Sequence, residues 1–151
     1  MKKVKLKTII LALILISGCS SKTAVRPPSE ESLKVKGLIE IVSNLNKAYV
    51  TKDNKSFMLY ISTSASIHED FKERIKRDFD TYEKISLNLT PRWARVREDS
   101  YQLSVHWEGK WHDPTGKEIR DLGNGLFTFK EEDGLKIIRI GGDSPFGISG
   151  E

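Results

Sequence analysis

The sequence lacks most of what could cross-link it or bind a metal: its 151 residues include one cysteine, Cys19, and three histidines. A lone cysteine excludes an internal disulfide and a metal site built from several cysteines. A surplus of one charge is also missing from most of the chain. The 25 basic side chains outnumber the 21 acidic ones, and the first seven residues hold four lysines that account for the whole excess. The balance elsewhere argues against a nucleic-acid partner, and we predict neither a metal nor another cofactor.

Long hydrophobic runs are absent too. The apolar run from Thr8 to Gly18 has eleven residues, whereas a membrane-spanning helix needs about 20. It follows the basic stretch Met1 to Lys7 and is typical of the hydrophobic region of a secretory signal. With 38% hydrophobic and 30% charged residues, the chain has the composition and length of one globular domain.

The apolar run ends in Ile16-Ser17-Gly18-Cys19-Ser20-Ser21, which resembles the lipobox of bacterial lipoproteins. The resemblance implies cleavage between Gly18 and Cys19 and acylation of Cys19 by chains such as palmitate. Several acyl chains anchor a protein firmly, because each buried CH₂ adds about 0.8 kcal/mol. Ser20 is similar to the outer-membrane sorting pattern of Gram-negative lipoproteins. The alternative is an ordinary cysteine that follows a plain signal peptide.

These features predict the domain organisation. Residues 1–18 form a lipoprotein signal peptide, residues 19–28 the lipidated cysteine and a tether, and residues 29–151 a single domain. The tether from Ser20 to Pro28 shows no periodicity, ends in two prolines and reaches at most about 30 Å. We therefore expect a lipid-anchored protein of the cell envelope, at the outer membrane if the host is Gram-negative, with the bilayer as a partner.

The first part of the domain has the pattern of three helices. Ser29 with Glu30 and Glu31 is typical of a helix start, and Asn54 is a candidate cap for a second, short helix. Ser66 to Glu69 matches a capping box, which predicts a third helix. Apolar residues recur every three to four positions on each helix. They are Val35, Leu38, Val42, Leu45 and Tyr49, then Phe57, Met58 and Ile61, then Phe71, Ile75, Phe79 and Tyr82.

From Ile85 onward the period changes to two, which is typical of strands with one buried face. A first strand runs to Pro91, and a second has one apolar face. That face consists of Tyr101, Leu103, Val105, Trp107 and Trp111. After a turn at residues 113–116, Asp133-Gly134 joins a strand around Phe127 to a last one over residues 135–140. The fold class is therefore α+β, with three helices followed by an antiparallel sheet of four to five strands.

Two stretches resemble the nuclear transport factor 2-like superfamily, also called the ketosteroid-isomerase-like fold. Residues Ala48 to Tyr60 contain an aromatic, an acidic break and an apolar turn, and residues Lys130 to Ile138 form a closing hairpin. Leu135 stands where a tryptophan commonly follows the hairpin glycine. The resemblance covers roughly residues 32–146. It implies a cone-shaped domain in which a curved sheet wraps the helices around an apolar pocket, and it leaves function open because the superfamily includes enzymes, ligand binders and scaffolds.

An isomerase or dehydratase of this fold needs a base in the pocket and a donor for an oxyanion. Asp53 and His68 are weak candidates for the base, since a break between helices and a first helical turn usually place side chains at the surface. Aromatic residues on the apolar stripes are either pocket residues or core. These pocket candidates are Tyr49, Tyr60, Tyr82, Tyr101, Trp107 and Trp111. No catalytic arrangement of the superfamily matches residue by residue, which argues against catalysis.

Two polar clusters are weaker indications. His106, Glu108 and His112 share one strand face, but the two histidines are about 20 Å apart along a strand, too far to bind one metal ion. The cluster that contains Trp93 is either the polar edge of a strand or a contact for acidic lipid headgroups or a carboxylate ligand. Its basic residues are Arg92, Arg95 and Arg97.

The last strand, residues 135–140, is apolar on both faces, which suggests a cover on the outside of the sheet. A homodimer through the sheet or the tail around Phe146 would supply that cover. We favour a membrane-anchored envelope lipoprotein whose domain binds a small apolar ligand or an envelope protein without catalysis. The alternative is a small isomerase, dehydratase or hydrolase that uses Asp53 or His68 with a tyrosine donor. A third hypothesis is a structural dimer without a ligand.

Overall fold

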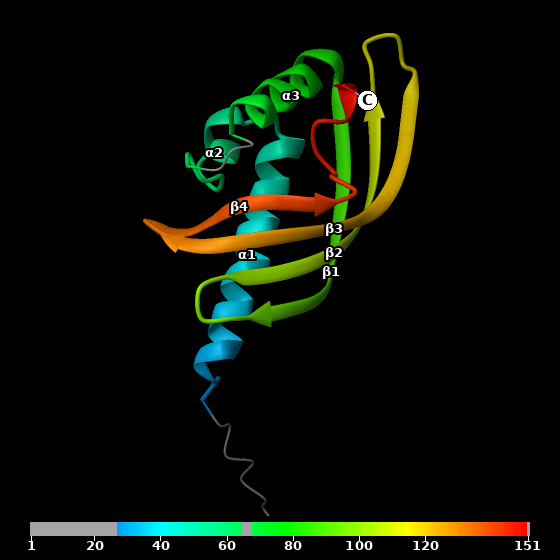
Figure 1. The fold of residues 1–151 in the computed structure, drawn as a ribbon. Helices are drawn as coiled ribbons and strands as arrows, with labels where there is room; N and C mark the ends of the chain where they lie inside the picture. The colour runs from blue at the N-terminus through cyan, green and yellow to red at the C-terminus, as the bar shows by residue number, and fades with distance from the viewer. Residues whose placement is uncertain (1–26, 65–67, 151) are drawn as a thin grey trace, which may run out of the picture.

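A computed structural model describes residues 27–64 and 68–150. Three helices come first, α1 (Glu30–Val50), α2 (Asn54–Met58) and α3 (His68–Thr81). Four strands follow, β1 (Lys84–Val96), β2 (Tyr101–His112), β3 (Glu118–Glu132) and β4 (Gly134–Gly142), and then a 3₁₀ turn, η2 (Ile148–Gly150). The strands form one antiparallel sheet in chain order, and the long strands bend around the helices (Figure 1). The predicted α+β class with three leading helices is confirmed, and the sheet has four strands.

α1 begins where the sequence predicts. The Ser29 hydroxyl accepts a hydrogen bond from the backbone N–H of Ser32 at 3.1 Å. Glu30 and Glu31 lie in the first turn, where the helix dipole favours acidic side chains. Within the two described ranges, no helix combines the length and the apolarity needed to cross a membrane. The buried residues of α1 are Leu38, Val42, Leu45, Ala48 and Tyr49.

The cap of α2 differs from the prediction. Asp53, not Asn54, caps this helix, since its carboxylate accepts a hydrogen bond from the backbone N–H of Ser56 at 3.0 Å. Lys52, with a φ of 57°, turns the chain just before the cap. Ile61, which we expected on this helix, lies beyond its end and forms a bridge with Ile137. Ser66 of the predicted capping box lies outside the described residues.

Two strands are longer than the sequence predicts. β1 continues past Pro91 to Val96, because β1 lies at the edge of the sheet and a bulge between Pro91 and Trp93 accommodates the missing N–H. β3 begins at Glu118, and its first half pairs with β2 even though it contains Gly123 and Gly125. Continuous pairing with β2 therefore outweighs the low strand propensity of these residues.

A second bulge explains why β4 is apolar on both faces in the sequence pattern. The register shifts between Thr128 and Phe129, so that Ile137 pairs with Phe129 and Ile140 pairs with Phe127. Both phenylalanines are fully buried, and directly paired residues share a face of the sheet. Ile140 therefore faces the core together with Ile137, and the expectation that the two lie on opposite faces is wrong.

The buried face of β2 contains one glycine among large residues. The apolar residues of this face are buried, as the alternation predicts. Gly109 interrupts the series because the indole ring of Trp111 lies over it. A Cβ atom added at Gly109 would come within 2.0 Å of a ring carbon of Trp111. The absence of a side chain at this position therefore gives Trp111 its place in the core.

We predict that Gly109→Ala destabilises the domain by about 1–3 kcal/mol, because the added methyl group forces Trp111 out of its packed position. Urea unfolding followed by circular dichroism measures this free energy. Gly141→Ala is the matched control, since its Cβ would meet nothing closer than the Leu126 carbonyl oxygen at 3.9 Å. Equal losses of stability in the two variants would contradict the packing that we describe.

Candidate functional site

Aromatic side chains fill the space between the helices and the sheet, where the resemblance predicts a pocket. The ring of Phe146, from the segment after β4, contacts three elements. Its centroid lies 4.9 Å from that of Tyr49 in α1, 5.2 Å from that of Phe57 in α2 and 6.2 Å from that of Phe127 in β3. Trp107 and Trp111 pack edge to face at 6.3 Å. All six side chains are at most 2% exposed.

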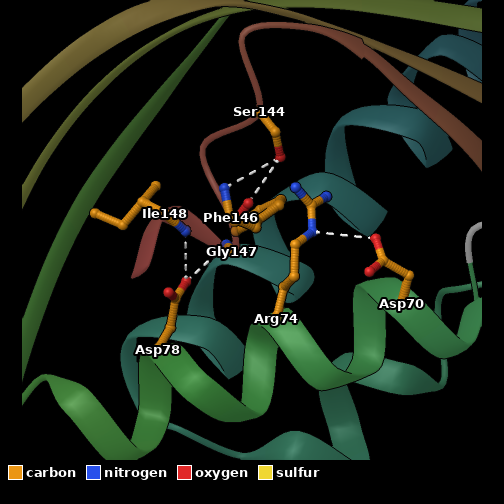
Figure 2. Close-up of polar contacts among 7 residues, drawn as sticks. All are labelled: Asp70, Arg74, Asp78, Ser144, Phe146, Gly147 and Ile148. Atoms are coloured by element: carbon orange, nitrogen blue, oxygen red, sulfur yellow. Dashed lines mark hydrogen bonds and ion pairs between the residues drawn. The ribbon is translucent and has the colours of Figure 1, made fainter. Parts of the chain in front are cut away.

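A buried carboxylate holds the C-terminal segment in this position. Asp78 of α3 is 0% exposed and accepts hydrogen bonds from three successive backbone N–H groups. The distances are 2.6 Å to Gly147, 3.2 Å to Ile148 and 2.8 Å to Ser149. The Tyr49 hydroxyl donates a fourth bond to the same carboxylate. Asp78 therefore links α1, α3 and the end of the chain, and Figure 2 shows its bonds to Gly147 and Ile148.

The segment itself is shaped to reach Asp78. The Ser144 hydroxyl donates a hydrogen bond to the Phe146 carbonyl at 3.0 Å and accepts one from the Phe146 N–H at 3.3 Å, which closes a tight turn (Figure 2). Gly147 has a φ of 74°, and a Cβ atom there would lie 2.9 Å from the Cβ atom of Arg74. Only glycine fits both the left-handed backbone and this close approach to α3.

Burial and charge compensation set the electrostatics of the interior. Burial raises the pKa of Tyr49 far above its ordinary value, and the neighbouring Asp78 charge raises it further. The indole N–H of Trp111 donates to the Tyr49 oxygen at 3.1 Å. Four donors directed at one carboxylate can compensate its charge away from water. The indole N–H of Trp111, the hydroxyl of Tyr49 and the carboxylate of Asp78 therefore all form hydrogen bonds within the protein.

This arrangement stabilises the fold and is closed to a substrate. Both oxygens of Asp78 already accept bonds from the chain itself, and the proton of Tyr49 is directed at Asp78. A general base needs a free oxygen facing the reacting proton. Asp78 and Tyr49 therefore do not have that geometry while the C-terminal segment is in place.

Sequence analysis did not single out Asp78, although the pattern contains a signal for it. Asp78 follows Ile75 by three positions and precedes Tyr82 by four, so it lies on the buried stripe of α3. An acidic residue at such a position is expected to have buried partners. Its partners could not be predicted from the sequence, because they are backbone N–H groups of residues 147–149.

Five of the six aromatic pocket candidates are buried, and Tyr60 is half-buried. Tyr49, Trp107 and Trp111 lie in the filled interior, and Tyr82 is buried just after α3, where burial raises its pKa. Tyr101 is buried near the start of α1, and its hydroxyl accepts a hydrogen bond from the Lys34 ammonium at 3.3 Å. Lys34 also lies over the Tyr101 ring.

Asp53 and Tyr60 line one shallow recess of about 330 Å³ that opens on the surface. Asp53 is exposed, and its hydrogen bonds with Ser56 lower the pKa of its carboxyl. A lowered pKa makes a carboxylate a weaker base. His68 is the first residue of α3, and its side chain lies outside the described residues. Gly18 and Cys19, the predicted cleavage and lipidation residues, also lie outside them.

The polar residues on the outer face of β2 bind different partners. The Nδ1 atom of His106 lies 3.2 Å from Asn124 Oδ1, and its Nε2 atom lies 3.5 Å from Glu108. The Nε2 atom of His112 pairs with Glu118 across the strand at 2.8 Å. Over residues 27–64 and 68–150, no three His, Cys, Asp or Glu side chains come together as a set of metal ligands.

A second polar cluster also went unnoticed in the sequence. Ser62 is 1% exposed, and its hydroxyl lies 2.9 Å from both oxygens of the Glu132 carboxylate. Ser64 bonds to the same carboxylate at 3.1 Å. The cluster ties the chain after α2 to the end of β3. The sequence gave no signal for it, because Glu132 is far in the chain from Ser62 and Ser64 and serine is common in turns.

Five recesses formed by residues in the described ranges are open to solvent, and Tyr49, Asp78, Trp107 and Trp111 line none of these five. The one of about 640 Å³ lies between the start of α1 and the end of β1. These five recesses are concave surfaces of the kind that ligands and partners contact.

No protein-family model matches the chain, and no curated protein matches it. Solved structures do match. A nuclear transport factor 2-like superfamily protein from Salmonella enterica serovar Typhimurium has a TM-score of 0.66 and 14% sequence identity over 76% of this chain and 93% of that one. A candidate dehydratase of the same family from Streptomyces avermitilis gives 0.64 and 12% over 73% and 95%.

The association domain of a Caenorhabditis elegans protein, CaMKII, is a third similar structure. Its TM-score is 0.57 with 12% identity over 76% of this chain and 98% of that domain. Likeness at such identities shows the fold alone, and the chain has the nuclear transport factor 2-like fold. Because a candidate enzyme and an association domain share it, the fold does not choose between catalysis and binding.

The raised pKa of Tyr49 predicts a specific loss of stability in alkali. The native state favours the protonated form of Tyr49. Its contribution to the free energy of unfolding is therefore complete below pH 10.0, the ordinary pKa of tyrosine, and is lost as the pH rises above that value. The slope is about 1.4 kcal/mol per pH unit for one proton. Above pH 10.0, we expect the free energy of unfolding of the native chain to fall more steeply with pH than that of Tyr49→Phe, by about 1.4 kcal/mol per pH unit.

Urea unfolding of the two proteins at a series of alkaline pH values measures both slopes. Tyr49→Phe should also be less stable at neutral pH, since it removes the donor to Asp78. Identical alkaline slopes would show that Tyr49 ionises alike in the folded and unfolded chains, and would contradict a buried hydroxyl.

Proposed function

We propose that the protein is an envelope lipoprotein, anchored through acylated Cys19, whose nuclear transport factor 2-like domain works as a non-enzymatic binding module at the membrane face. The observation that carries the proposal is the filled interior. Phe146 occupies the space between helices and sheet, and Asp78 holds the segment that carries it. The domain thus has no interior room for a substrate in the described conformation.

The filled interior also bears on what the module binds. A small apolar ligand held inside the cone would need the volume that Phe146, Trp107 and Trp111 occupy. The surface recesses are open and lined by charged and polar residues together with apolar ones. This favours a partner recognised at the surface, such as an envelope protein or the bilayer, over an enclosed apolar molecule.

The anchor is supported by the order of segments in the sequence. A basic stretch, a short apolar run and the lipobox-like residues around Cys19 precede α1 directly. Seven residues lie between Cys19 and Pro27, where the described chain begins, and this span reaches at most about 28 Å. A domain so close to its lipid anchor works beside the bilayer. A homodimer through the sheet is the competing use of the outer sheet face, and the mass of the protein in solution tests it.

A small isomerase, dehydratase or hydrolase is the second candidate. It is favoured by the buried tyrosine–carboxylate pair, Tyr49 and Asp78, and by the likeness to a candidate dehydratase. Catalysis at this pair would require the C-terminal segment to leave, since residues 147–149 occupy the carboxylate. Saturable binding of a small aromatic dye inside the native chain would favour this candidate. An interior that excludes the dye favours the binding module.

We predict that Cys19→Ala abolishes the anchor. The native chain should partition into the detergent phase of Triton X-114 and lose its first 18 residues, because acylation of Cys19 precedes cleavage at the resembled lipobox. The variant should stay uncleaved and carry no acyl chain, which labelling with radioactive palmitate detects. Ser21→Ala is the control and should behave like the native chain. Unchanged cleavage and labelling in Cys19→Ala would overturn the lipoprotein proposal.

A further inference from the structure

A row of paired residues crosses the outer face of the four-stranded sheet and has an arginine at each end. Arg95 of β1 pairs with Gln102, Gln102 with Thr128, and Thr128 with Arg139 of β4. Paired residues share a face, and the neighbouring Leu103 is buried against the core. This row therefore faces away from the helices, with an arginine at each edge about 14 Å apart.

The neighbouring rows continue the pattern. Trp93 pairs with Ser104, and Ser104 with Leu126. On the other side, Lys130 follows the buried Phe129 and so lies on the outer face. None of these paired rows contains an acidic residue. We call this surface the basic sheet face and define it by Trp93, Arg95, Lys130 and Arg139, together with Arg92, the exposed residue of the bulge before Trp93.

Its charges are free to bind an anion. Among the described residues, Arg92, Arg95 and Arg139 have no acidic partner within ion-pair distance. The acids Glu98, Asp99 and Glu131 line one recess with Lys130, whereas the paired rows of Arg95 and Arg139 contain no acid. A sheet face with several unpaired arginines attracts phosphate groups strongly.

Trp93 adds an apolar element to this face. Its side chain is 46% exposed, whereas Trp107 and Trp111 are buried. The Arg95 guanidinium lies over the Trp93 ring, 5.5 Å from its centroid. An exposed tryptophan beside cationic side chains is typical of the interface between water and lipid, where the ring packs against the acyl region and the charges bind headgroups.

The position of the face suits contact with the anchoring bilayer. The end of β1 lies against the start of α1, since Val96 and Arg97 line one recess with Ser29 and Lys34. The tether joins the domain at this end. The residues between Cys19 and Pro27 reach at most about 28 Å, so the start of α1 and the end of β1 beside it stay near the acyl chains.

We propose that the basic sheet face lies on the bilayer that holds Cys19, with Arg92, Arg95, Lys130 and Arg139 on anionic phospholipid headgroups and Trp93 in the interface. The inference rests on the proposed lipid anchor. The anchor supplies attachment, and the face fixes which side of the domain meets the membrane. The opposite side, with α2 and α3, then points away from it.

The experiment uses the acylated protein reconstituted into vesicles of phosphatidylcholine, with or without phosphatidylglycerol, that contain brominated phosphatidylcholine as a quencher. Because the other two tryptophans are buried, the signal that Trp93→Phe removes belongs to Trp93. We expect brominated lipid to quench that signal about twofold with phosphatidylglycerol present, and salt to reverse the effect. Arg95→Gln with Arg139→Gln should weaken it.

The matched control is Lys110→Gln with Arg120→Gln, a pair on the same outer face at the far end of the sheet, which should leave the quenching unchanged. Vesicle-bound protein whose Trp93 signal is not quenched would overturn the membrane contact and leave the anchor standing. Protein that fails to bind vesicles would overturn the anchor and this inference together. Trp93 shielded from iodide without vesicles would show that a second copy covers the face, and would also overturn it.

Discussion

The hydrogen bonds that converge on Asp78 determine the shape of the domain. A carboxylate on α3 is held out of water by the Tyr49 hydroxyl and three N–H groups of the last residues. Leaving such a charge buried without partners would cost several kcal/mol, so the C-terminal segment stays where it is. Phe146 is thereby placed among the rings of three elements. Side chains thus fill the space between the helices and the sheet in which the fold could hold a pocket.

The sequence alone was sufficient for the class of fold and for most buried positions. Alternation along β2 identified its core face, and the spacing of Phe71 and Ile75 identified that of α3. These predictions succeeded because periodicity reports directly which side of an element avoids water. Bulges were not predictable in this way. The register shifts near Pro91 and Thr128 depend on pairing between strands. The predicted end of β1 and the predicted orientation of Ile140 were therefore wrong.

The interior differs from the predicted pocket for a related reason. Tyr49, Trp107 and Trp111 were correctly placed on apolar stripes, but a stripe cannot show whether a cavity or another ring lies opposite. Phe146 and Asp78, which fill and close that space, belong to segments far apart in the chain. This closure is why we propose recognition at the surface, where the proposed acyl anchor and the basic sheet face would hold the domain at a bilayer.

The stability of Asp78→Asn tests the central claim most directly. The account predicts a loss of about 2–4 kcal/mol in urea unfolding, because the neutral amide cannot accept all four bonds, together with faster amide exchange at residues 147–149. Asp80→Asn, at an exposed acid that pairs with Lys76, should lose no more than about 0.5 kcal/mol. If Asp78→Asn were as stable as Asp80→Asn, with residues 147–149 still protected, the buried carboxylate would not be what closes the interior.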